Sequence, residues 1–109
     1  MRQILFASVA VALLFTGGCG PARPLTESEF KGFCYQYTGL RQPDCDTIAV
    51  CDEYLTVTGL PQPSREKCLE ECQAVYKPQF MRYVNTGCTG SAQYAEEWCE
   101  KYCVTNYPK

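Results

Sequence analysis

The chain has 109 residues, with ten basic and twelve acidic side chains, nine cysteines and no histidine. This length suits one small domain, and the slightly acidic balance argues against nucleic-acid binding, which needs a basic surface. Histidine is the most common general base and metal ligand, so its absence argues against hydrolytic triads and the usual haem-attachment motif. We therefore expect a protein that is not an enzyme and that has no cofactor and no metal site.

The N-terminus has the form of a signal peptide. Arg2 supplies the positive charge, and residues 4–15 form an uncharged, apolar run. This run is shorter than the about 18 apolar residues that a membrane-spanning helix needs. The sequence therefore predicts a cleaved leader and not a permanent membrane span.

The apolar run leads into the motif Phe15-Thr16-Gly17-Gly18-Cys19. This motif resembles the lipobox of bacterial lipoproteins, although a threonine stands where leucine is usual. The resemblance implies that residues 1–18 are removed as the signal peptide and that Cys19 is acylated, for example with palmitate. Residues 19–25 would then tether the domain to a membrane through its lipid anchor.

The residues after Cys19 bear on location. In enteric-type lipoproteins an aspartate next to the anchor resembles an inner-membrane retention signal, and Gly20 at this place favours the outer membrane. The alternative is ordinary cleavage after Ala22, where Gly20 and Ala22 provide the small side chains of a cleavage site. In that case the protein is secreted and not anchored in the cell envelope.

Eight cysteines remain once one is assigned to the lipid. They are Cys34, Cys45, Cys51, Cys68, Cys72, Cys88, Cys99 and Cys103. An even number in an exported small domain predicts four disulfides, which compensate for a small core. Zinc bound by four thiolates is one alternative. Thiol redox chemistry is another, but it prefers a Cys-x-x-Cys spacing that is missing here.

The spacing of apolar residues predicts helices throughout the rest of the chain. A first helix begins at a capping box formed by Thr26 and Glu29 and ends at Gly39. A second runs from Pro43-Asp44 to about Val57. Its predicted apolar face contains Cys45, Ile48, Ala49 and Leu55, with Asp52 as a polar exception.

Two further helices are expected in the C-terminal half. One begins at the cap Ser64 and reaches about Val84 with a kink or break at Pro78. The last begins after the cap Ser91 and carries Trp98 and Tyr102 on its cysteine-bearing face. The predicted fold class is thus all-α, a small disulfide-rich domain of about four helices over residues 26–109.

Two Cys-x-x-x-Cys pairs place their sulfurs one helical turn apart, on one side of each helix. If the two helices pack antiparallel, the outer cysteines pair as Cys68–Cys103 and the inner ones as Cys72–Cys99. Residues 64–104 resemble, in geometry only, the hairpins of plant hairpinins and small mitochondrial Tim chaperones. Antiparallel packing of the first two helices favours Cys34–Cys51. This leaves Cys45–Cys88 by elimination among about 105 connectivities.

Four tyrosines fall off the cysteine-bearing faces and are candidate surface contacts for an envelope protein or a glycan. They are Tyr35, Tyr54, Tyr94 and Tyr107. The adjacent carboxylates Glu70-Glu71 and Glu96-Glu97 point about 100° apart on a helix, and we expect them on solvated faces. These features favour a lipid-anchored interaction or structural module of the cell envelope. A secreted inhibitor or toxin-like peptide and a periplasmic thiol redox protein are the alternatives.

Overall fold

The computed structural model describes residues 23–38 and 45–109, so the expected signal peptide, Cys19 and the first-helix stop Gly39 lie outside the described residues. Within the described part every regular element is a helix, which confirms the all-α fold class. The helices are α2 (Glu27–Tyr35), α3 (Thr47–Asp52), α4 (Leu55–Thr58), α5 (Arg65–Tyr83) and α6 (Thr89–Asn106).

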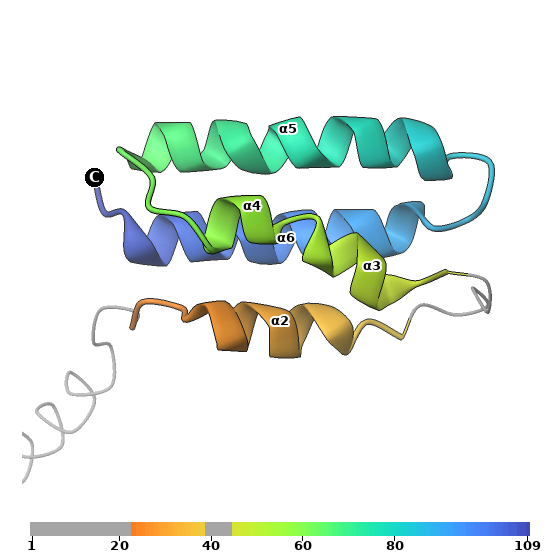
Figure 1. Ribbon diagram of the computed structural model, residues 1–109, viewed down its shortest axis with the longest axis horizontal. Helices are drawn as coiled ribbons and strands as arrows, with labels where there is room; N and C mark the ends of the chain where they lie inside the picture. Colours follow the sequence, from red (N-terminus) through yellow and green to blue (C-terminus); the bar gives the residue numbers. More distant parts are fainter. Residues whose placement is uncertain (1–22, 39–44) are drawn as a thin grey trace, which may run out of the picture.

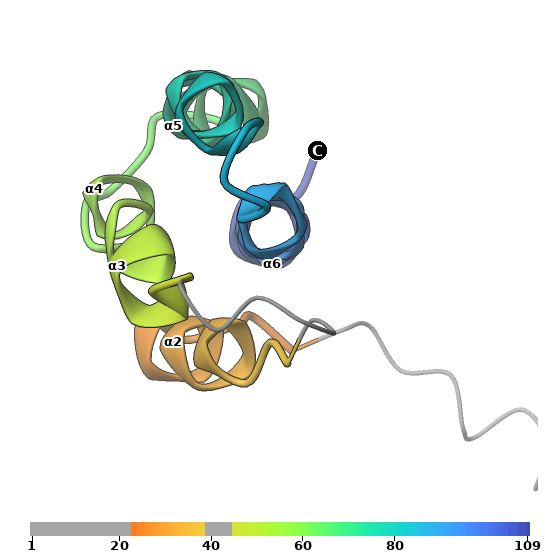
Figure 2. The same ribbon diagram turned by 90° about the vertical axis from the view of Figure 1, so that its right-hand side faces the viewer.

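The two long helices α5 and α6 form an antiparallel hairpin (Figure 1). Helix α2 packs against α6 and α3. Helix α3 also packs against α6, and the short helix α4 contacts α2, α5 and α6. Seen end-on, the helices surround a common centre (Figure 2). This arrangement lets short amphipathic helices bury their apolar faces together.

Local sequence signals explain where two of the helices begin. Thr26 and Glu29 form the expected capping box at α2, and the Ser64 side chain accepts a hydrogen bond from the amide of Lys67 at α5. After α5 the chain turns through Gly87, whose φ of 82° suits a residue without a side chain. Both N-terminal caps are therefore confirmed.

Of the predicted kink or break at Pro78, the break is wrong, because α5 continues through this residue to Tyr83, next to the predicted end at about Val84. The missing proline amide leaves the carbonyl of Ala74 without its helical partner. Ala74 is exposed, so that carbonyl can be hydrated. The start of α6 also differs from the prediction: the helix begins at Thr89, and Ser91 is buried in its first turn.

The second predicted helix is divided in two, and its buried face was assigned wrongly. A turn at Glu53 and Tyr54 separates α3 from α4. Ile48, expected in the core, is 56% exposed, while the residues that reach the core are Val50, Cys51, Tyr54 and Val57. This face is rotated by about half a turn from the predicted one.

The core is built mainly of cysteines and small residues. Its fully buried members are Phe30, Cys34, Val50, Cys51, Tyr54, Val57, Cys68, Cys72, Ala92, Ala95, Cys99 and Cys103. The two alanines allow the helices around α6 to approach it closely. A search of the described residues found no helix long and apolar enough to cross a membrane.

Candidate functional site

Four disulfides join the helices, and they are the same four pairs that are predicted from the sequence. They are Cys34–Cys51, Cys45–Cys88, Cys68–Cys103 and Cys72–Cys99. The last two form rungs between α5 and α6, with Cα–Cα distances of 5.6 and 5.9 Å. Cys34–Cys51 fastens α2 to α3, and Cys45–Cys88 fastens the residues before α3 to the start of α6.

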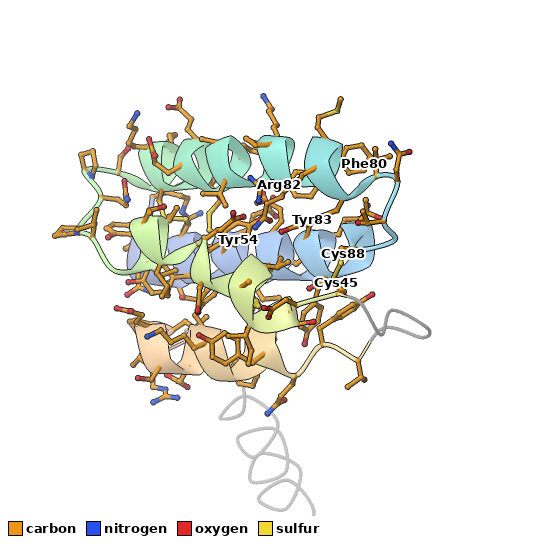
Figure 3. All side chains as sticks on the ribbon, turned by 45° about the vertical axis from the view of Figure 1, so that its right-hand side comes forward. Cys45, Tyr54, Phe80, Arg82, Tyr83 and Cys88 are labelled. Atoms are coloured by element: carbon orange, nitrogen blue, oxygen red, sulfur yellow. A yellow bond between two sulfur atoms is a disulfide. The ribbon has the colours of Figure 1, made fainter. Side chains whose placement is uncertain are left out.

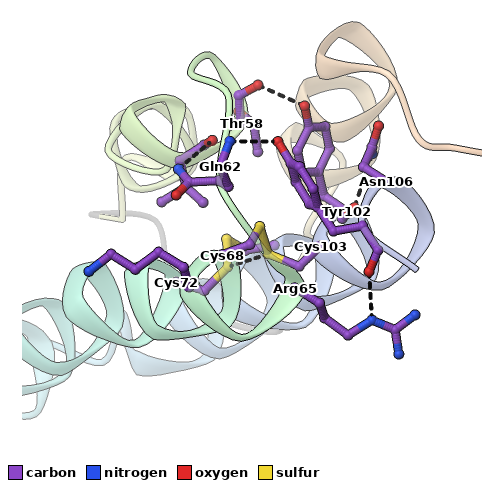
Figure 4. The surroundings of a disulfide bond; sticks show 12 residues. Thr58, Gln62, Arg65, Cys68, Cys72, Tyr102, Cys103 and Asn106 are labelled. Carbon is purple, nitrogen blue, oxygen red and sulfur yellow. Dashed lines mark hydrogen bonds between the residues drawn. A yellow bond between two sulfur atoms is a disulfide. The ribbon is translucent and has the colours of Figure 1, made fainter. Parts of the chain in front are cut away.

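The sulfurs of Cys68, Cys72 and Cys103 lie within 4.8 Å of one another, close enough to suggest a metal site. In the structure they belong to the two adjacent rungs, as Figure 4 shows. A metal would need these sulfurs as thiolates. The disulfides thus account for the cluster without a metal.

Tyr54 was predicted as a surface contact, and this is wrong. Its side chain has 0% exposure, and its hydroxyl donates a weak 3.5 Å hydrogen bond to the carbonyl oxygen of Ala92. Burial is the main cause of the raised pKa of Tyr54, and the charge of Glu96 adds to it. Tyr54 is a core residue that joins the α3–α4 turn to α6.

Tyr35 and Tyr107 are partly exposed, but their hydroxyls are used inside the fold. The Tyr35 hydroxyl donates to Asp52, and this hydrogen bond is the main reason that the pKa of Tyr35 rises to about 12. The Tyr107 hydroxyl accepts from the amide of Gln62 at 2.9 Å, and its carbonyl accepts from Arg65 Nε at 2.8 Å (Figure 4). Both tyrosines connect neighbouring segments.

Tyr94 belongs to an aromatic row that was not predicted from the sequence. Its members are Phe33 on α2, Tyr37 just after α2, and Tyr94 and Trp98 on α6. The ring centres of Tyr37 and Tyr94 lie 5.1 Å apart, and the ring of Tyr94 meets that of Trp98 edge-on. Phe33 stacks on Trp98, with 4.3 Å between the ring centres. The ammonium group of Lys101 lies 4.3 Å from the centre of the same indole ring. Because Phe33 and Lys101 both already lie over the indole ring of Trp98, they restrict the stacking of a ligand on this ring.

Glu96 was expected on a solvated face, and the structure corrects this. The residue is only 6% exposed, and Gln73 Nε2 donates to its Oε1 at 2.5 Å, whereas Oε2 has no hydrogen-bond partner. Burial, followed by the nearby carboxyl group of Glu100, raises the pKa of Glu96 to about 7. It lies four residues after Ala92 and three residues before Cys99, on the same side of α6 as these two buried residues. Glu97, next to it, is exposed as expected.

The first described residues are fastened to the end of α6. The Leu25 amide donates to Thr105 Oγ1 at 3.1 Å, and Asn106 Nδ2 donates to the Leu25 carbonyl oxygen at 2.8 Å. Leu25 also packs against the core. Leu25, which precedes the capping box of α2, is therefore part of the folded domain and lies close to the C-terminus of α6.

The described residues define a small, all-α domain closed by four disulfides. Such cross-links fit an oxidising, extracytoplasmic location. No family model matches the chain, and comparisons with curated proteins and with solved structures found no match.

Proposed function

We propose that the protein is a lipid-anchored module of the bacterial cell envelope, with a structural or binding role and no catalytic activity of its own. The motif that ends at Cys19 motivates this proposal, and the attachment of Leu25 to Thr105 and Asn106 is the structural observation that supports it. With acylation at Cys19, only a few residues would separate the lipid from the rigid domain. A short tether holds a domain at the bilayer surface in a restricted orientation.

This attachment also indicates which end of the domain would face the bilayer. The start of α2, the start of α5 and the end of α6 lie at one end of the bundle, and the turn between α5 and α6 lies at the other (Figure 1). Anchoring through Cys19 would place the first end against the membrane. The end with Cys45 and Cys88 would then point away from it.

In a binding role, the aromatic row is the surface that would contact the partner. Tyr94 is partly exposed and lies in it with Tyr37 and Trp98. Aromatic residues are enriched at recognition surfaces because they bury a large area at a low cost in conformational entropy. An envelope protein or a glycan could contact the outer edges of these rings without displacing Lys101.

The proposal is tested by feeding an alkyne-labelled fatty acid to the producing bacterium and fractionating its envelope. We expect label and membrane association for the wild-type protein, and neither for Cys19→Ala. The double variant Cys45→Ala/Cys88→Ala is a matched control, because it removes two other cysteines and leaves Cys19 in place, so it should keep the label. A wild-type protein without label that is found in the medium would overturn the proposal in favour of a secreted inhibitor or toxin-like peptide.

A further inference from the structure

The Cys45–Cys88 disulfide differs from the other three in its access to solvent. Among the eight described cysteines, Cys45 alone is partly exposed, whereas the other seven are buried at 5% exposure or less. Cys45 precedes α3, and Cys88 lies in the turn between α5 and α6, at one end of the bundle (Figure 3). Cys45 is therefore, of the eight, the cysteine most open to a dissolved thiol.

Cys88 occupies a position that stabilises a thiolate. It is the N-cap of the 18-residue helix α6, and no side chain caps the free amides of the first turn. Such amides and the helix dipole lower the pKa of a cysteine thiol. A sulfur with a lower thiol pKa is also the better leaving group in thiol–disulfide exchange.

Ser91 adds a second, independent feature. It lies three residues after Cys88, so both belong to the same side of the first turn. Ser91 is 1% exposed, and its Oγ has no hydrogen-bond partner. No hydrogen bond joins the two side chains while the disulfide is intact, so a bond from this hydroxyl to Cys88 Sγ would form only after that sulfur is released as a thiolate.

From these features we propose that Cys45–Cys88 is a reversible S-thiolation site for small thiols. The incoming thiolate attacks Cys45 Sγ and forms a new S–S bond there. The Cys45–Cys88 bond breaks, and its electron pair remains on Cys88 Sγ as a thiolate. One disulfide replaces another, so the step needs no additional oxidant or reductant.

The rest of the fold does not depend on this bond. The two rungs still join α5 to α6, and Cys34–Cys51 still joins α2 to α3. Exchange would release only the residues before α3 from the start of α6. The site is independent of the lipid anchor and would function equally in a secreted protein.

The test incubates the fully oxidised protein with reduced glutathione, alkylates free thiols at timed intervals and maps peptides by mass spectrometry. We expect glutathione on Cys45 and the alkyl group on Cys88, formed at least about tenfold faster than any product of the other three disulfides. Equal rates at all four disulfides, or no product at Cys45, would overturn the proposal. Glutathione mainly on Cys88 would overturn the direction of attack.

The role of Ser91 is tested with Ser91→Ala, measured by the ratio of adducts at Cys45 and Cys88. Loss of a stabilised leaving group should shift this ratio toward Cys88, which a general loosening of the fold would not do. Ser64→Ala is the matched control, because it removes a hydroxyl from the start of α5 and should leave the ratio unchanged. If the ratio is unchanged in Ser91→Ala, this residue has no part in the exchange.

Discussion

Cys72 and Cys103 are not bonded to each other, yet their Sγ atoms lie only 3.5 Å apart. Each belongs to a different rung of the α5–α6 hairpin, so the two disulfides touch inside the core. Sulfur here fills space that leucine or isoleucine fills in larger domains. The rungs are therefore part of the core packing as well as covalent links.

The double variant Cys72→Ala/Cys99→Ala should lose about 2–5 kcal/mol of unfolding free energy, the usual cost of removing a native disulfide from a small domain. Full reduction should abolish the cooperative thermal transition, measured by circular dichroism. Lys77→Ala, on the exposed face of α5, is the control and should change stability by no more than about 0.5 kcal/mol. A reduced protein that melts cooperatively at nearly the oxidised temperature would contradict the structural role of the disulfides.

Glu96 should make the domain less stable as the pH rises. Its pKa is about 7 in the folded protein and 4.5 in a solvated chain, so between these values the folded state holds a proton that the unfolded state has lost. The contribution of Glu96 to the free energy of unfolding should be fully present below pH 4.5 and should be lost as the pH rises to about 7. Urea denaturation across this range measures the effect.

Glu96→Gln should flatten this dependence, because the amide is neutral and keeps an acceptor for Gln73. Glu97→Gln, the exposed neighbour, should leave the slope as it is. The pKa of Glu29 is lowered, mainly by its hydrogen bond with the Thr26 backbone, so this residue titrates below the window and does not interfere. An unchanged slope in Glu96→Gln would mean that another group causes the pH dependence.

Tyr54 should be the most sensitive of the four tyrosines singled out in the sequence. Tyr54→Ala removes a fully buried ring, and we expect a loss of about 3–5 kcal/mol, as for other buried aromatics. Tyr54→Phe removes only the weak hydrogen bond to Ala92 and should cost about 1 kcal/mol or less. Tyr94→Ala removes the ring pairs with Tyr37 and Trp98, each of which should contribute about 0.5–1.5 kcal/mol. Equal losses for Tyr54→Ala and Tyr94→Ala in chemical denaturation would refute this ranking.

The attachment of Leu25 to α6 can be tested by amide hydrogen exchange. Thr105→Val keeps the shape of the side chain but removes the acceptor for the Leu25 amide, so this amide should exchange about tenfold faster. Thr56→Val is the control, since the Thr56 hydroxyl bonds locally to Glu53. No change at Leu25 in Thr105→Val would show that the segment is not held by this hydrogen bond.

The sequence predicted the helical class and the helical hairpin because those features depend on local patterns. The Cys-x-x-x-Cys spacing and the caps at Thr26 and Ser64 each act within one or two turns of helix. The buried face around Tyr54 was missed because it depends on a turn that divides the second helix. The predicted Cys34–Cys51 disulfide could have identified this face, because Cys51 must then point toward the core. Tyr54 lies three residues after Cys51 and therefore on the same side of the chain.

The burial of Glu96 and Ser91 could not be predicted from local patterns. Both residue types are usually exposed or at caps, and their positions follow from how closely α6 approaches its neighbours. Ala92 and Ala95 make this approach possible because they add little volume. The identity of a small residue thus determines the environment of the polar side chain beside it.

The intact mass of the protein extracted from membranes tests the central claim most directly. We predict a chain that begins at Cys19, carries two or three acyl chains and takes up no alkylating reagent until it is reduced. After reduction it should gain one alkyl group for each cysteine of the four disulfides. An unacylated chain that begins at Arg23, or one that is alkylated before reduction, would contradict a lipid-anchored and fully oxidised domain.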